Sequence, residues 1–148
     1  NYNYIFMLGV WQGQYWFDEY KNIPEILKNR KTSFNLYINE FANNNFSGNV
    51  QDDLETGGTP GIGTINGSVM GNNIDFVKKM PVRSAIFPDG QMRTLKGKHP
   101  KIHYSGIWDQ TTKTLTGTWK IKFGISWLGI VPIIHPPTKG HWIARKQV

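Results

Sequence analysis

Cysteine is absent from this sequence of 148 residues. Its absence excludes disulfide bonds, thiolate catalysis and metals held by cysteine. It does not select a compartment, because a cysteine-free chain suits a reducing cytosol and a bacterial envelope equally well. The first residue is Asn1 rather than methionine, which leaves open whether a segment before it has been removed. The localisation is therefore unknown from the sequence.

Long apolar runs are also lacking. No stretch approaches the roughly 20 apolar residues of a membrane-spanning helix, so we expect a soluble protein. A chain of 148 residues is long enough to bury a core and short enough for one domain. We therefore expect a single domain over residues 1–148.

The motifs of common enzyme and metal sites are missing as well. The sequence contains no H-E-x-x-H helix, nucleophile elbow, phosphate-binding loop or EF-hand. Its four histidines are scattered along the chain. We expect no catalytic residue, no metal and no cofactor, with a haem on one histidine as a minor alternative.

Positive charge is in excess, with 17 Lys or Arg residues against 10 Asp or Glu and a formal net charge of +7. The excess suits an anionic partner, and it equally suits a small basic protein that is simply soluble. The segment from Lys78 to Lys101 holds seven of these basic residues but only Phe87 for base stacking, so we expect no nucleic-acid partner. This segment is predicted to be a loop, either a lid or a solvated surface loop.

Alternation of apolar and polar residues with period two dominates the rest of the sequence. It recurs in eight stretches, which are 9–17, 33–41, 45–53, 62–70, 73–80, 101–109, 114–122 and 139–146. Turn-forming residues join several of them, such as Ala42 to Asn45 and Gly71 to Asn73. Short strands with one apolar face each indicate a sandwich or a barrel, and successive hairpins favour the barrel. The predicted fold is all-β, an eight-stranded antiparallel up-and-down β-barrel.

Glycine and tryptophan are paired along these stretches. Four of the six tryptophans follow a glycine by two residues, as in Gly9-Val10-Trp11 and Gly117-Thr118-Trp119. Residues i and i+2 of a strand face the same side, so the glycine is expected to make room for the indole on the inner wall. The indoles either pack the core or line a ligand cavity.

Gly9-Val10-Trp11 on the first predicted strand resembles the Gly-x-Trp signature of lipocalins and other calycins. Avidin-like barrels also begin with such a strand. The resemblance implies a calycin, lipocalin-like architecture that binds a small molecule. It further implies that Trp11 packs against a basic residue of the last strand, either Arg145 or Lys146.

The inner faces of the predicted strands supply a candidate ligand site. Asp52 and Lys78 share these faces with apolar residues, so they are expected to pair inside the barrel, with Tyr104 as a further member. The alternative is that both charges lie at a solvated rim. The full predicted set of ligand-binding residues is Trp11, Tyr15, Phe34, Leu36, Asp52, Phe76, Lys78, Tyr104, Trp108 and Trp119.

A second feature is the apolar segment from Gly124 to Pro137, which is predicted to be a covered loop. Packing over one barrel end is the preferred cover, a homodimer contact is second, and a membrane surface is third and not expected. The favoured function is noncovalent binding of a small apolar or amphipathic molecule. The alternatives are an interaction module that uses the 124–137 loop and an enzyme that uses Asp52 and Lys78 for proton transfer.

Overall fold

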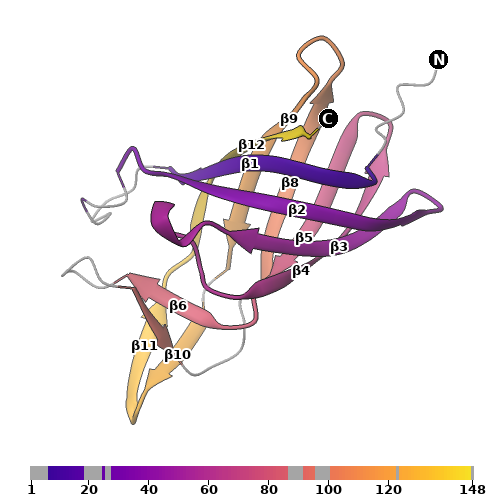
Figure 1. Cartoon of the computed structure of the whole chain (residues 1–148). Helices are drawn as coiled ribbons and strands as arrows, with labels where there is room; N and C mark the ends of the chain where they lie inside the picture. Colours follow the sequence, from indigo (N-terminus) through magenta and orange to yellow (C-terminus); the bar gives the residue numbers. More distant parts are fainter. Residues whose placement is uncertain are drawn as a thin grey trace.

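The computed structural model describes residues 7–18, 25, 28–86, 92–95, 101–122 and 124–147. Eight long strands close into an antiparallel barrel in the order β1-β12-β9-β8-β5-β4-β3-β2, which confirms the predicted fold (Figure 1). Their bounds are β1 (Gly9–Phe17), β2 (Lys31–Ala42), β3 (Asn45–Asp52), β4 (Ile62–Met70), β5 (Asn73–Lys79), β8 (Lys101–Asp109), β9 (Thr114–Ile121) and β12 (Thr138–Lys146). Each lies within two residues of a predicted stretch, because alternation marks every strand that has one buried face.

The turns follow the predicted chemistry. Between β2 and β3, Asn43 and Asn44 have φ values of 53° and 66°. Two adjacent residues in the left-handed region define a hairpin turn that matches the twist of its strands, and asparagine tolerates that region. The first and last strands, β1 and β12, pair with each other and complete the barrel.

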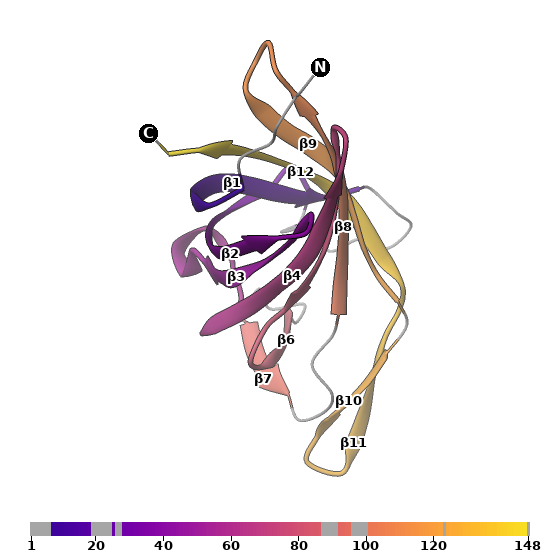
Figure 2. The same ribbon diagram turned by 90° about the vertical axis from the view of Figure 1, so that its right-hand side faces the viewer.

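Two further hairpins extend beyond the barrel. One consists of β6 (Arg83–Ile86) and β7 (Met92–Leu95), and the other of β10 (Gly124–Leu128) and β11 (Val131–His135). Both emerge at the barrel end where β5 and β9 finish, which we term the hairpin end (Figures 1 and 2). Strand β7 contacts β10.

The loop predictions for these two segments are therefore wrong in part. Gly129, with a φ of 64°, begins a two-residue turn that folds 124–135 into a ribbon. Pro132 is compatible with this ribbon, since each strand of a two-stranded sheet keeps one unpaired edge where a missing N–H is tolerated. In the basic segment, 83–86 and 92–95 pair as strands, while 87–91 and 96–100 lie outside the described residues.

The opposite end of the barrel, termed the far end, is closed by side chains. Met7 is fully buried there, and its carbonyl accepts a hydrogen bond of 2.9 Å from the Trp11 indole nitrogen. The Trp108 ring meets the Trp11 ring edge-on at a centroid distance of 5.8 Å. Half-buried residues that pack on the core lie at both ends, among them Phe41 and Trp108 at the far end and Phe17 and Ile121 at the hairpin end.

Two glycines of the Gly-x-Trp pairs make room for indoles as predicted, but for indoles of other strands. Trp142 lies opposite Gly117 in the register, and a Cβ built on Gly106 would lie 2.6 Å from the Trp142 ring. Trp119 lies opposite Gly140, whose added Cβ would again lie 2.6 Å from the indole. Trp119 therefore occupies the space above a glycine of the neighbouring strand, and Trp142 occupies the space above a glycine two strands away. The indoles of β9 and β12 thus pack on glycines of β12 and β8, and this interlocking holds the three strands together.

Within the described residues, no helix is both long enough and apolar enough to cross a membrane.

Candidate binding site in the barrel interior

A buried ion pair lies inside the barrel near the hairpin end. The Lys78 ammonium nitrogen lies 2.7 Å from a carboxylate oxygen of Asp52, and the two side chains are 2% and 1% exposed. The inward alternative from the sequence is thus the correct one, and the solvated-rim alternative is wrong. Two charges are kept from water at this depth only when each has close partners.

Tyr15 is the third member of this cluster. Its hydroxyl donates a hydrogen bond of 3.3 Å to the second Asp52 oxygen. The Lys78 ammonium lies 4.8 Å from the centroid of the Tyr15 ring and 5.5 Å from that of Phe34. Since β1 and β5 lie on opposite walls of the barrel, the contact between Lys78 and Tyr15 spans its interior.

A short segment after β3 covers Asp52. The 3-10 turn η2 (Leu54–Thr56) leads into it, and the backbone N–H of Thr59 donates to Asp52 at 3.1 Å. Gly58 is buried against the carboxylate, and a Cβ on it would lie 2.2 Å from the Cβ of Asp52. The glycine at position 58 therefore lets the backbone of this segment lie directly against the buried acid.

Thr56 anchors this covering segment to β2. Its carbonyl accepts hydrogen bonds from Arg30 at 3.1 Å and from the Thr32 hydroxyl at 3.0 Å. Its own hydroxyl accepts a bond of 2.9 Å from the Ser33 N–H. The sequence provided no periodic signal for these contacts, because they join a turn to a strand edge.

Tyr104 was predicted to join the charged network, and it does so only indirectly. Its ring stacks on Phe76 at a centroid distance of 4.7 Å and contacts Phe34 at 6.4 Å. The side chain is buried, at 3% exposure, and its hydroxyl has no hydrogen-bond partner among the residues that the structure describes. A buried hydroxyl without a partner is uncommon and requires an explanation.

Both tyrosines of the site remain neutral donors at ordinary pH. Burial raises the pKa of the Tyr15 hydroxyl well above its usual range, and the Asp52 charge raises it further. Burial likewise raises the pKa of the Tyr104 hydroxyl well above its usual range, with a smaller contribution from Tyr15 and Asp52. The site therefore presents O–H and N–H donors rather than a phenolate base.

The ten predicted site residues fall into three contact groups. At the far end Trp11 contacts Trp108, and Leu36 lies opposite Trp11 in the register. The second group, Phe34, Phe76 and Tyr104, is joined by ring contacts. The third group, Tyr15, Trp119, Asp52 and Lys78, lies nearest the hairpin end, with Trp119 meeting Tyr15 edge-on at 6.0 Å.

The interior of the barrel is partly filled by these contacts. Phe34 on β2 and Tyr104 on β8 belong to opposite walls, so their contact crosses the barrel. The buried ion pair lies nearer the hairpin end than these rings do. Three half-buried residues that the sequence did not single out, Phe17, Ile102 and Ile121, pack on the core there. Alternation placed them inward, but nothing in the pattern distinguished a rim residue from a core residue.

The two hollows described on the surface are of a different kind. The larger one, about 820 Å³, runs over β12, β1 and β2 beside η2. Its walls include the outward, exposed side chains of Gln12, Gln14 and Gln51. The smaller one, about 430 Å³, lies over the Phe46 region of β3 and β4. Both hollows are open to solvent, whereas apolar ligands are bound in sites that bury most of their surface.

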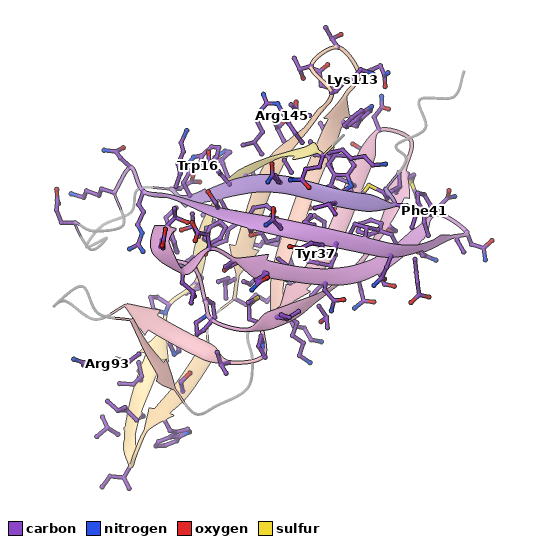
Figure 3. The ribbon with its side chains drawn as sticks, in the orientation of Figure 1. Trp16, Tyr37, Phe41, Arg93, Lys113 and Arg145 are labelled. Carbon is purple, nitrogen blue, oxygen red and sulfur yellow. The ribbon has the colours of Figure 1, made fainter. Side chains whose placement is uncertain are left out.

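The predicted partner of Trp11 is resolved by the register. Trp11 lies opposite Lys146, while Arg145 lies opposite Gln12 on the outer surface (Figure 3). A Cβ on Gly9 would lie 2.9 Å from the Lys146 side chain, which places that lysine beside the barrel end. Partial burial lowers the pKa of Lys146. Lys146 is thus the basic residue on the same side of the sheet as Trp11.

The described histidines lie away from this interior. His141 bonds Asp18 at 2.6 Å on the outer face, and His135 bonds the buried Ser126 at 2.8 Å in the β10–β11 hairpin. No group of three or more His, Asp or Glu side chains suited to a metal occurs among the described residues. His99 lies outside them.

Comparison of this chain with protein-family models, with curated proteins and with solved structures finds no match. The fold is an eight-stranded up-and-down antiparallel barrel, and its function has to be argued from the site alone.

Proposed function

We propose that this protein binds a small, largely apolar molecule that carries a hydrogen-bond acceptor. The ligand enters at the hairpin end, between Phe17, Ile102 and Ile121. Its polar group faces Lys78 and Tyr104. The Gly9-Val10-Trp11 resemblance to calycins is consistent with such a role.

The observation that carries the proposal is the unpartnered Tyr104 hydroxyl. It lies in an interior that also holds an ammonium group with a single carboxylate partner among the described residues. Lys78 has three N–H donors, and Asp52 accepts one of them. The ammonium also lies over the Tyr15 and Phe34 rings, and a carbonyl or ether oxygen of the ligand would accept from an N–H that Asp52 does not use.

The charge of the site favours a neutral ligand. Asp52 compensates Lys78 at 2.7 Å, so an added carboxylate would meet no net positive charge. The aromatic groups around the pair match an apolar ligand body. A ketone, ester or aldehyde on a hydrocarbon frame therefore fits better than a fatty acid.

Tyr104→Phe tests this role with little effect on the fold. The change removes a hydroxyl that has no described partner, so the free energy of unfolding should not fall. We expect the neutral ketone dye prodan to bind the wild type with a blue-shifted emission, and Tyr104→Phe to weaken that binding by about tenfold, as for one lost hydrogen bond.

Tyr37→Phe is the matched control, because Tyr37 lies on the outer face of β2 and is 38% exposed (Figure 3). It should bind prodan like the wild type. The proposal is wrong if neither prodan nor a series of 2-alkanones changes the dye emission or the unfolding temperature. It is also wrong if both tyrosine variants bind equally well.

A further inference from the structure

The β10–β11 hairpin presents an apolar surface to solvent. Ile125, Trp127 and Ile134 are 46%, 47% and 64% exposed on one face. Ile130 at the tip is 93% exposed. The predicted packing of this segment over its own barrel is therefore wrong, because the ribbon extends away from the barrel (Figure 2). Residues 124–134 contain no charged side chain, so this surface matches no polar partner.

A row of lysines, termed the collar, lies beside the base of this hairpin on the outer wall of the barrel. It consists of Lys79, Lys101, Lys120, Lys122 and Lys139, all exposed. None of the five forms an ion pair with a described residue. The collar covers the hairpin end of four adjacent strands, β5, β8, β9 and β12.

The register makes this collar costly for the isolated protein. Lys79 lies directly opposite Lys101, and Lys120 lies directly opposite Lys139. Like charges at directly opposed positions destabilise a sheet. An anionic partner at this end would neutralise both pairs.

We propose that the hairpin end docks on an anionic lipid bilayer, with the β10–β11 tip inserted and the lysine collar against the headgroups. A five-residue strand is about 17 Å long, so the tip extends well beyond the barrel end. Apolar segments of interfacial proteins enter the bilayer by about 5–10 Å, a depth that the tip residues can reach while the collar stays in the headgroup region. The inference is independent of ligand binding inside the barrel.

A second copy of this chain fits the surface less well. A symmetric dimer through the hairpin would use the same patch on both subunits and bring two collars of five lysines together. Their mutual repulsion opposes the apolar contact, whereas a bilayer of anionic lipid satisfies both features at once.

Vesicle sedimentation of the full chain tests the proposal. We expect binding to equimolar phosphatidylcholine and phosphatidylserine, little binding to phosphatidylcholine alone, and release as salt rises above about 0.1 M. Ile130→Ser should weaken binding by at least about tenfold. Met70→Ser removes a side chain that is 81% exposed at the β4–β5 turn, and it should bind like the wild type.

The role of charge is tested by replacing lysines at the hairpin end and, as a control, a lysine at the far end. Lys120→Gln should weaken binding about fivefold, and the double change with Lys139→Gln about 25-fold. Lys113→Gln, at the β8–β9 turn far from the hairpins, should have little effect (Figure 3). Trp127→Phe should still bind but lose the blue shift of tryptophan emission.

Three outcomes would overturn the proposal. The first is no sedimentation with either vesicle. The second is equal weakening by Lys113→Gln and Lys120→Gln, which would indicate adsorption through net charge. The third is a dimer in light scattering that Ile130→Ser abolishes while vesicles bind neither form, which would make a second copy the occupant.

Discussion

Lys78 and Tyr15 are linked in two ways across the barrel. The Lys78 ammonium lies 4.8 Å from the Tyr15 ring centroid, and the Tyr15 hydroxyl donates to the carboxylate that pairs with Lys78. Asp52 thus contacts both the Lys78 ammonium and the Tyr15 hydroxyl, which come from opposite walls of the barrel. This relationship leads to the first two predictions.

Breaking the ion pair should cost more than removing it. Lys78→Met leaves Asp52 charged and without its cation, so we expect a loss of about 3–5 kcal/mol in the free energy of unfolding. Asp52→Asn should likewise be destabilising. The double variant should lose less than the sum, because no uncompensated charge remains. Urea unfolding of the four proteins measures the coupling, and simple additivity would contradict a buried pair.

Alkaline pH should destabilise the protein through Tyr15 and Tyr104. Their pKa values are raised in the folded state, so above the ordinary value of about 10 the unfolded chain releases protons that the folded chain retains. Their stabilising contribution is complete below that pH and is lost as pH rises, by about 1.4 kcal/mol per pH unit for each tyrosine. Urea unfolding measured at several pH values above about 10 should show this slope. In Tyr15→Phe the slope due to the two buried tyrosines should be halved. An unchanged slope in that variant would be the contrary result.

Filling the space above Gly106 should be unfavourable. Its added Cβ would lie 2.6 Å from Trp142, so Gly106→Ala should cost about 1–3 kcal/mol through overpacking. The smaller ring in Trp142→Phe should make the same alanine less costly when the two changes are combined. Thermal unfolding of the single and double variants gives the comparison, and an equal alanine cost in both backgrounds would refute the interlocking.

Trp11 should depend on Lys146 more than on Arg145. Trp11→Ala should cost about 3–5 kcal/mol, as for other large aromatic residues in a core. Lys146→Ala should cost about 1 kcal/mol by uncovering this end of the barrel, since lysine stems cover apolar surface. Arg145→Ala, on the outer face, should stay within about 0.5 kcal/mol of the wild type. Denaturation midpoints that reverse the order of the two basic residues would contradict this assignment.

The barrel and the inward pair were predictable because both follow from period two. Alternation placed Asp52 and Lys78 on the same side as their apolar neighbours, and burial of that side decided their orientation. The contacts around Asp52 were not predictable. Thr59 reaches it through the backbone of a turn, and Tyr15 reaches it from a strand two places away in the barrel. Such contacts depend on the curvature of the closed sheet, which a linear pattern does not contain.

The hairpin at 124–135 shows where a correct observation led to a wrong conclusion. Its apolar content was evident, and burial was expected because exposed apolar surface is unfavourable in water. The segment was predicted to be a loop, but Gly129 and Pro132 suit a narrow ribbon with free edges. A single sequence does not show whether such a surface is covered by its own chain or by another phase.

Closure through β1 and β12 also has a consequence for how the chain folds. Until β12 is in place, β1 and β9 each expose an unpaired edge, since β12 lies between them. The strand that completes the barrel is the last one along the chain, and its partner β1 is more than a hundred residues away. Pairing over such a separation is slow, typically on the scale of milliseconds to seconds, so nascent chains spend that interval with two edges open to intermolecular pairing. Until β12 pairs, the open edges of β1 and β9 therefore offer a route to intermolecular pairing that the closed barrel does not have.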